Sequence, residues 1–353
     1  MRKNSFFLIS IVTAILLCIS SCEHRPLVEL NEQRYVRIYL DEQLRNVNFG
    51  FYDETRERPT YTPPEIMRVA MFNPETGEMV TERYLRDKGS DEKGNYMHGY
   101  IYVPQGTYNL VAYNFDTHAI NVRDDRWYTY MEAYTEPVSE QTKNKLESLK
   151  TKGETDIDEV ILKEPEHFFV NNSKGVNAKL SESTDTLKNA DGSDFVAKSI
   201  VKTYYMQLNV KGVRYVKSAV ALITGMAGSA RIHDGRLNDE SPVSIYFPMK
   251  NDVSKMRSND DTAVAYATFN TFGKLANVEG YINITFEFNT TWGTVQTESI
   301  RITDMFETQQ VRENQWIIID KVIEIVPPDD GESAGGMSPG VGKWDQVEGG
   351  ITI

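Results

Sequence analysis

The sequence predicts an all-β protein of two tandem β-sandwiches, preceded by a leader peptide and a short tether. Three observations carry this prediction. Short segments with alternating apolar and polar residues recur along most of the chain, which is typical of strands with one buried face. Clusters of Gly, Pro, Asn and Asp separate these segments. The chain has 19 tyrosines and 15 phenylalanines, which favour sheets, and residues 139–151 are its one good helix candidate.

Residues 1–21 have the features of a lipoprotein signal peptide. Met1-Arg2-Lys3 is a short positive segment, and residues 6–19 are almost entirely apolar. This run is shorter than the roughly 20 residues that span a bilayer, so it fits a cleaved leader better than a retained membrane helix. Ser20-Ser21-Cys22 then resembles the lipobox, in which the cysteine is acylated and becomes the new N-terminus. An ordinary secretory signal and a retained anchor are the alternatives.

Cysteine usage supports acylation. The two cysteines, Cys18 and Cys22, lie in this first segment, so a processed chain would keep Cys22 alone. A disulfide within that chain, a cysteine metal site and a thiol nucleophile are thereby excluded. One acyl chain binds a membrane only marginally, whereas two or more signals anchor a protein firmly. We therefore expect Cys22 to be the lipidation site. Glu23 is not the Asp that marks inner-membrane retention in some bacteria, which favours the outer membrane; surface and periplasmic faces both stay open.

The charge of the chain disfavours a nucleic-acid partner. Its formal net charge is −13 at pH 7, and it has no basic stripe with interleaved aromatic residues. Phosphate backbones are bound through Lys and Arg, so such a chain would be repelled.

Residues 22–33 are predicted to be a lipidated tether, and residues 34–180 the N-terminal β-sandwich. Pro104-Gln105-Gly106 is expected to join two strands in a tight hairpin, because Pro fixes φ and Gly supplies a positive φ. The polar stretch 171–194 is expected to contain the domain boundary. The strands expected in this half are 34–40, 66–72, 79–85, 96–103, 107–115, 127–134, 160–162 and 167–170, with a short last one at 176–180.

Residues 195–326 are predicted to form the C-terminal β-sandwich. In residues 282–288, Ile and Phe alternate with Asn, Thr and Glu, as in a half-buried antiparallel strand. About seven strands in each half, separated by turn residues, favour a sandwich. The strands expected here are 196–210, 216–224, 243–247, 263–269, 281–288, 295–302 and 316–326.

Residues 327–353 are predicted to be a flexible linker and a terminal strand. A Gly/Ser/Pro-rich run extends to Gly342, and apolar residues follow it. This last segment either folds back on the second sandwich or pairs with another subunit by strand addition. The residues of this candidate docking strand are Trp344, Val347, Ile351 and Ile353.

Several segments together resemble fimbrillin-like lipoproteins of Bacteroidetes. They are the lipobox ending at Cys22 with the following Glu23-His24-Arg25-Pro26, the stretch at 103–114 with its Pro-x-Gly-x-Tyr turn and Tyr113-Asn114 pair, and Ala221 to Gly228. The resemblance implies two tandem transthyretin-like sandwiches, membrane anchoring, and a role in fimbria assembly or attachment. It carries over no catalytic residue and no cofactor. Polymerising members of the family lose an N-terminal strand by cleavage after an arginine. We identify no such processing site here, which favours a lipid-held anchor or accessory subunit that docks fimbrial subunits through sheet edges.

Enzyme motifs fail in their context. Gly331-Glu332-Ser333-Ala334-Gly335 matches the G-x-S-x-G of an esterase, but prolines flank it and the last histidine, His233, precedes it. The five histidines lack the spacing of a zinc site. We therefore expect no enzyme, no metal and no cofactor.

The alternative function is glycan capture for an outer-membrane uptake system. Trp127, Tyr128, Tyr130 and Tyr134 would supply an aromatic platform, the three tyrosines sharing one strand face. Core packing of these rings is the competing interpretation.

Overall fold

The computed structural model describes residues 32–41, 62–146, 159–178, 186–238, 241–257, 261–275 and 282–327. Within these ranges strands are the main element and helices are few, which confirms the predicted all-β class. The described helices are short, and none is long and apolar enough to cross a membrane. They are α2 (Glu140–Leu146), α3 (Gln309–Asn314) and the 3-10 turns η3 (Val213–Tyr215) and η4 (Thr303–Glu307). The predicted signal peptide, the lipidation site Cys22, and the tail residues Trp344, Val347, Ile351 and Ile353 lie outside the described residues.

The first sandwich is one eight-stranded sheet in the order β3-β2-β6-β10-β11-β1-β5-β4. It folds over at β11, which pairs antiparallel with β10 and parallel with β1, so that the two halves of the sheet face each other. Alternation places Val36 and Ile38 of β1 inside, against Leu110 of β6 and Phe195 of β11. The bounds are β1 Glu32–Leu40, β2 Met67–Phe72, β3 Met79–Leu85, β4 Asp87–Asp91, β5 Gly94–Val103, β6 Gly106–Asn114, β10 Phe169–Ala178 and β11 Phe195–Ser199.

The hairpin predicted at Pro104-Gln105-Gly106 is wrong in its pairing. β5 pairs with β1 and β4, whereas β6 pairs with β2 and β10. The turn therefore carries the chain from one layer of the sandwich to the other. Tyr108 fastens it by donating its hydroxyl proton to the Pro104 carbonyl at 3.1 Å. A hairpin between neighbouring strands and a connection between layers have the same local turn signal. That signal specifies a chain reversal but not the strand that pairs next.

The second sandwich has the order β18-β17-β13-β15-β16-β12-β19, with β9 added beside β15. The long strand β15 belongs to both layers, since its first part pairs with β13 and its later part with β16. Phe247 and Phe269 stack between the layers with ring centroids 4.2 Å apart. The bounds are β9 Val160–Leu162, β12 Lys202–Lys211, β13 Val216–Ala227, β15 Pro242–Arg257, β16 Thr262–Thr271, β17 Asn283–Thr290, β18 Val295–Arg301 and β19 Trp316–Glu324.

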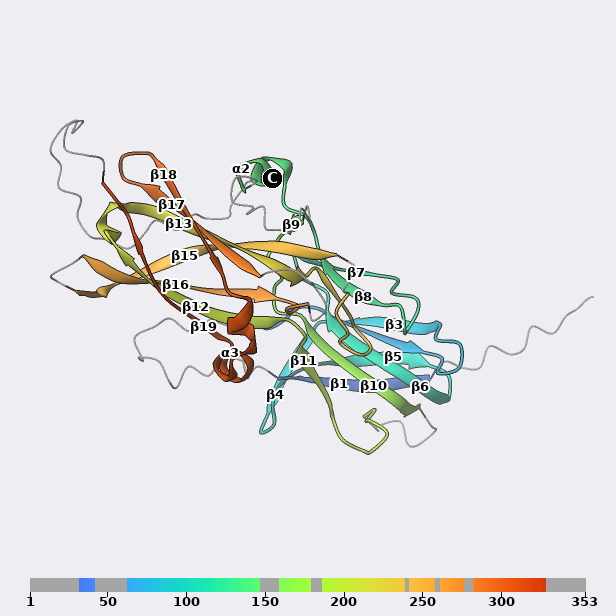
Figure 1. The fold of residues 1–353 in the computed structure, drawn as a ribbon. Coiled ribbons are helices and arrows are strands. Elements are labelled where there is room, and N and C mark those ends of the chain that lie inside the picture. Colours follow the sequence, from blue (N-terminus) through green and yellow to red (C-terminus); the bar gives the residue numbers. More distant parts are fainter. Residues whose placement is uncertain are drawn as a thin grey trace, which may run out of the picture.

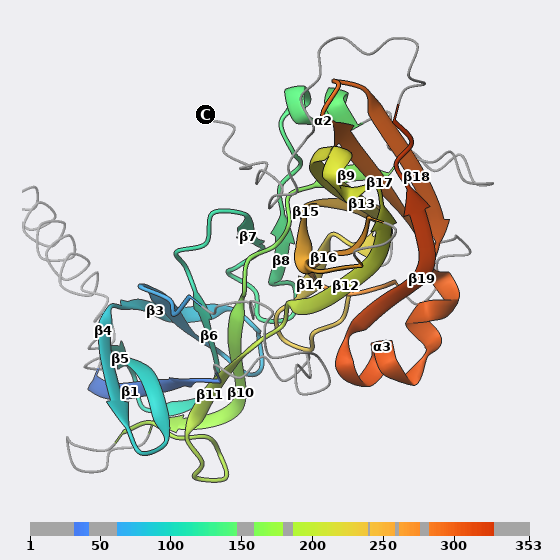
Figure 2. The same cartoon turned by 90° about the vertical axis from the view of Figure 1, so that its left-hand side faces the viewer.

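A small third sheet and a shared core join the two sandwiches, which lie end to end (Figures 1 and 2). Its order is β14 (Ser229–Arg231), β8 (Glu132–Thr135), β7 (Ile120–Arg123), so a strand from the second half of the chain pairs with one from the first. The apolar cluster around it takes Phe72 and Phe168 from the first half and Phe272 from the second. Such a contact holds the sandwiches in a fixed relation.

The predicted domain boundaries stay predictions, but two strands join a different sheet from the one they imply. β9, expected in the N-terminal sandwich, pairs in parallel with β15 of the second. The carboxylate of Glu159, just before it, accepts the Gly225 N–H at 3.2 Å and the Ser244 hydroxyl at 2.8 Å. β11, expected to open the C-terminal sandwich, completes the first sheet. Alternation of apolar and polar residues identifies a strand but not its neighbours. It therefore does not predict which sheet the strand joins.

Candidate functional site

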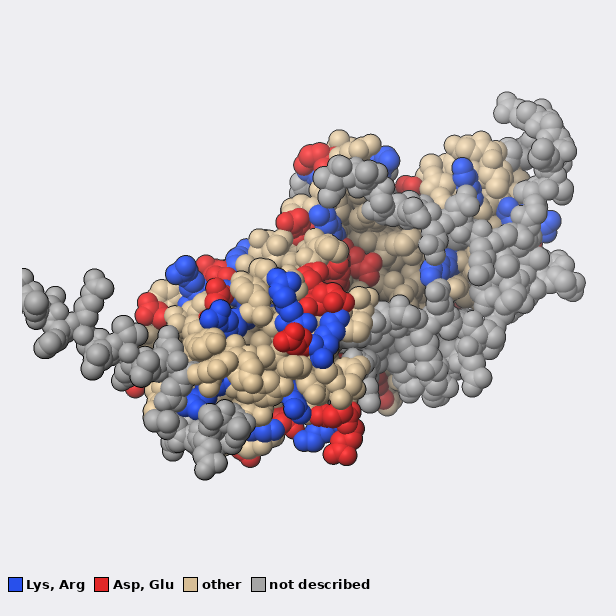
Figure 3. Space-filling model, turned by 180° about the vertical axis from the view of Figure 1, so that it is seen from behind, with Lys and Arg blue, Asp and Glu red and all other residues tan. Residues whose placement is uncertain are grey.

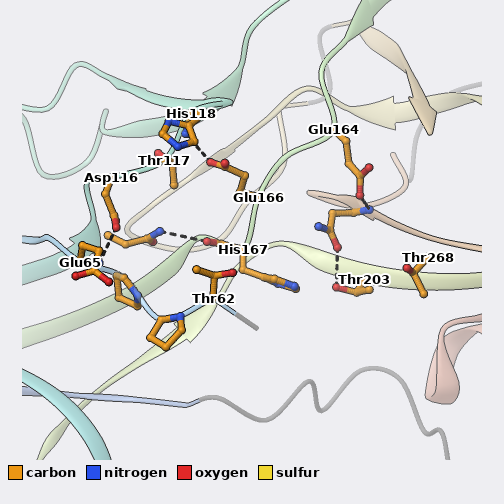
Figure 4. Close-up of a pocket in the computed structure, with 14 residues that line it drawn as sticks. Thr62, Glu65, Asp116, Thr117, His118, Glu164, Glu166, His167, Thr203 and Thr268 are labelled. Atoms are coloured by element: carbon orange, nitrogen blue, oxygen red, sulfur yellow. Dashed lines mark hydrogen bonds between the residues drawn. The ribbon is translucent and has the colours of Figure 1, made fainter. Parts of the chain in front are cut away.

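A pocket of about 540 Å³ opens where the two sandwiches meet (Figure 4). Its walls come from three places: the segment after β6, the segment between β9 and β10, and the facing ends of β12 and β16. Polar side chains dominate the lining. They include Asn114, Asp116, Thr117, His118, Glu164, Glu166, His167, Thr203, Thr268 and Asn270, with Thr62, Pro63, Pro64 and Glu65 at the margin.

Several of these polar side chains bond to backbone groups of the junction. Glu166 accepts the His118 N–H at 2.6 Å, and Asp116 accepts the Glu65 N–H at 2.6 Å. Asn114 accepts the Phe169 N–H at 2.7 Å. Because unpaired backbone groups are costly when buried, these bonds fix the loops of the junction.

Glu164 is the most perturbed group in the pocket. Its Oε1 accepts the Asn270 N–H at 2.7 Å, and Thr203 donates to the side-chain oxygen of Asn270 at 2.7 Å. Burial raises the pKa of Glu164 to about 8, so its carboxyl is mainly protonated at neutral pH. Burial also lowers the pKa of His167, which keeps the imidazole neutral. No lysine, arginine, serine or cysteine is among the described residues that line the pocket. Of its four threonines, Thr203 donates to Asn270 and Thr117 donates to the Ile120 carbonyl. The arrangement fits a polar joint between the sandwiches better than a nucleophile with its base.

A second hollow, of about 790 Å³, runs beside β3, the end strand of the first sheet. The loop before β8 forms its far wall and is attached at the start of β3, where the Met79 N–H donates to the Arg126 carbonyl at 3.0 Å. Exposed apolar side chains line it: Val80 is 43%, Tyr84 42% and Trp127 42% exposed. We call this hollow the β3 groove.

Arg68 supports the β3 groove from beneath. Its buried guanidinium forms ion pairs with Glu82 and Asp125, each at 2.6 Å, and donates to the Tyr113 hydroxyl. The three partners come from β3, the loop before β8 and β6, so one side chain links both walls and the floor. An ion pair this buried is rigid because each lost contact would leave a desolvated charge.

Other end strands differ from β3. β18 and β19 end opposite layers of the second sandwich, and side chains connect them: Gln296 donates to the Glu324 carbonyl at 2.7 Å, and Lys321 pairs with Glu298. On the face seen in Figure 3, acidic and basic side chains are interspersed, so no single-sign field marks a docking site there. In contrast to β18 and β19, β3 adjoins a hollow in which Val80, Tyr84 and Trp127 lie among charged side chains.

The aromatic platform predicted at residues 127–134 is wrong. The chain makes a turn there, and β8 begins only at Glu132. Tyr128 is buried and donates to the Asn172 side chain at 2.7 Å, whereas Tyr130 is 65% exposed, so the rings do not share one face. Of the set, only Trp127 lines the β3 groove. The groove itself escaped the sequence analysis; its one local signal is Arg68 inside an apolar strand.

Comparison with known proteins places the chain among fimbrial proteins of Bacteroidetes, as its resemblance predicted. The model of DUF5119, a domain of unknown function, matches residues 21–248. A protein of Bacteroides ovatus named "Putative fimbrium anchoring subunit Fim4B" is 24% identical over 371 residues and covers 98% of both chains.

A solved structure supports the fold. A Bacteroides ovatus structure described as a "putative adhesin" aligns with a TM-score of 0.52 and 23% identity, over 86% of this chain and 94% of the other. The fimbrial anchor protein Mfa2 of Porphyromonas gingivalis aligns over 82% and 90%, with 17% identity and a TM-score of 0.42. With a family match over more than half of its length, the chain belongs to the DUF5119 family.

Proposed function

We propose that this protein is a lipid-anchored subunit of the outer membrane that holds a fimbrial subunit at the cell envelope. The observation that carries the proposal is the near end-to-end alignment, 98% of both chains, with a relative named for fimbrium anchoring. A relative that aligned with only one domain of this chain would support only a shared fold. This alignment spans nearly the whole length of both chains.

Anchoring is assigned to Cys22. An apolar leader and small residues precede it, and the chain has no cysteine after it. Acylation at this position would place the tether, predicted as residues 22–33, between the membrane and the first sandwich. No cofactor enters the proposal, because the work is mechanical.

Docking is assigned to the outer edge of β3. The start of β3 is taken by Arg126, and Leu85 at its end lies against Gly99 of β5. Between them the end strand presents backbone N–H and C=O groups that an extended segment of a partner can pair with. Val80, Tyr84 and Trp127 border that row and offer apolar contacts for alternate side chains of the incoming segment. Backbone hydrogen bonds would supply the affinity, and the side chains of the β3 groove would supply the selectivity. The terminal residues Trp344, Val347, Ile351 and Ile353 are the second docking element, donated outward from beyond β19.

A matched pair of substitutions tests the docking site. Val80→Lys places a charge at the β3 groove, and Val295→Lys places the same charge on β18, another end strand where the valine is 55% exposed. Chemical cross-linking of cells, purification and mass spectrometry would measure the recovery of fimbrial subunits. We expect Val80→Lys to reduce recovery at least about tenfold, since a partner that covers the groove would have to strip water from the added ammonium group, and Val295→Lys to leave it unchanged.

Equal recovery in both variants would remove the β3 groove from the proposal. A variant lacking residues 344–353 tests the tail in the same assay. Absence of fimbrial subunits even from the unmodified protein would contradict the proposed function as a whole.

A further inference from the structure

The outer face of β1 and β5 carries a ladder of aromatic side chains. Strand alternation puts them opposite the core residues of the same strands. Tyr35 meets Tyr100 with ring centroids 5.3 Å apart, and Tyr39 meets Tyr96 at 5.3 Å. The members of this aromatic ladder are Tyr35 and Tyr39 from β1, and Tyr96, His98, Tyr100 and Tyr102 from β5. The guanidinium of Arg37 lies over the Tyr96 ring, 4.4 Å from its centre.

The two ends of the aromatic ladder differ in exposure. At the Leu40 end, the Tyr39 hydroxyl donates to Asp91 at 2.7 Å, Arg37 donates to the same carboxylate at 3.0 Å, and Tyr39 is only 5% exposed. At the other end, Tyr100 is 52% and Tyr102 39% exposed. Large exposed rings are therefore gathered at one end of the ladder.

That exposed end lies beside the first residues of β1. Tyr100 is opposite Tyr35 in the sheet, and Tyr102 is opposite Gln33. The chain from Cys22 to Glu32 reaches at most about 36 Å when fully extended. Acylation of Cys22, on which this inference rests, would thus hold the exposed tyrosines close to the membrane, while the second sandwich lies at the opposite end of the molecule (Figure 1).

We infer that Tyr100 and Tyr102 rest on the lipid headgroup layer and set the orientation of the anchored protein. Tyrosine suits this layer because its ring is apolar and its hydroxyl is wet. The guanidinium of Arg83 lies 5.0 Å from the ring centre of Tyr102, where it can meet lipid phosphates. Two rings and one cation bind weakly alone, but the tether raises their effective concentration at the surface. The second sandwich then points away from the membrane.

The test uses the processed chain, whose thiol at Cys22 is coupled through a reducible disulfide to a thiol lipid in phosphatidylcholine vesicles. This coupling replaces native acylation, so the orientation is tested even if the proposed lipidation is wrong. Hydroxyl-radical labelling with mass spectrometry measures the accessibility of each tyrosine before and after release by a reductant. Tyr130, 65% exposed on the loop before β8, is the internal control.

We expect labelling of Tyr100 and Tyr102 to be at least about threefold lower on vesicles than after release, because the headgroups would cover most of the exposed surface of these two rings. Labelling of Tyr130 should not change. Equal labelling in both states would overturn the inference. Equal protection of Tyr130 would also overturn it, because the protein would then be shielded without a preferred orientation.

Discussion

Replacing Glu164 by glutamine should remove a pH dependence built into the junction of the two sandwiches. In the folded protein burial raises the pKa of this carboxyl from 4.5 to about 8. The folded state therefore keeps a proton that the unfolded chain releases above pH 4.5. The contribution of Glu164 to the free energy of unfolding is therefore greatest below pH 4.5. It falls as the pH rises toward about 8 and is constant above pH 8. Glutamine keeps an oxygen to accept the Asn270 N–H, and it does not titrate.

The magnitude follows from the two pKa values. One proton held only by the folded state changes stability by about 1.4 kcal/mol per pH unit. Between about pH 5 and about pH 7.5 the unmodified protein should lose about 3 kcal/mol relative to Glu164→Gln, as an upper limit. The quantity to measure is the difference in free energy of unfolding between the two proteins. Other titrating groups, such as His167, are present in both, so their contributions cancel.

Urea unfolding followed by tryptophan fluorescence, at several pH values, measures this difference. We expect the midpoints of the two proteins to coincide near pH 5 and to separate as the pH rises, with Glu164→Gln the more stable. Parallel curves across this range would refute the reasoning, since they would mean that Glu164 is ionised in the folded state and solvated or paired there.

Two further predictions concern the groove and the shared core. Arg68→Met should cost about 2 kcal/mol in urea unfolding, because the buried Tyr113 hydroxyl and two half-buried carboxylates lose the guanidinium that they share. Lys211→Met, which removes the exposed pair with Glu324, should cost under about 0.5 kcal/mol. Equal costs would contradict the buried role of Arg68. Phe272→Ala should cost about 3–5 kcal/mol and increase protease cleavage at the junction. The exposed Phe115→Ala is its control, and matching cleavage patterns would argue against a shared core.

Much of the fold was predictable from local alternation. Segments such as Ile282 to Phe288 carry the two-residue period that a sheet with one buried face demands, and they form strands in the structure. What failed was pairing. Pro104 to Gly106 joins two layers rather than two neighbours, and β9 crosses into the other sandwich. These choices depend on contacts far apart in sequence, which no local pattern encodes.

The candidate sites were less predictable for the same reason. Arg68 gains its role from Asp125, 57 residues later in the chain. The aromatic ladder required the register of β1 against β5, which is fixed only when the sheet assembles. The expected platform at residues 127–134 failed because Trp127 to Met131 make a turn that covers the start of β3, and propensity alone favoured a strand there.

The mass of the N-terminal peptide tests the central claim, membrane anchoring, most directly. Protein purified from its own membranes and digested should yield a peptide that begins at Cys22 and carries two or three acyl chains, with residues 1–21 absent. A peptide that retains the leader, or one that begins at or near Cys22 with a free thiol, would contradict the anchoring account.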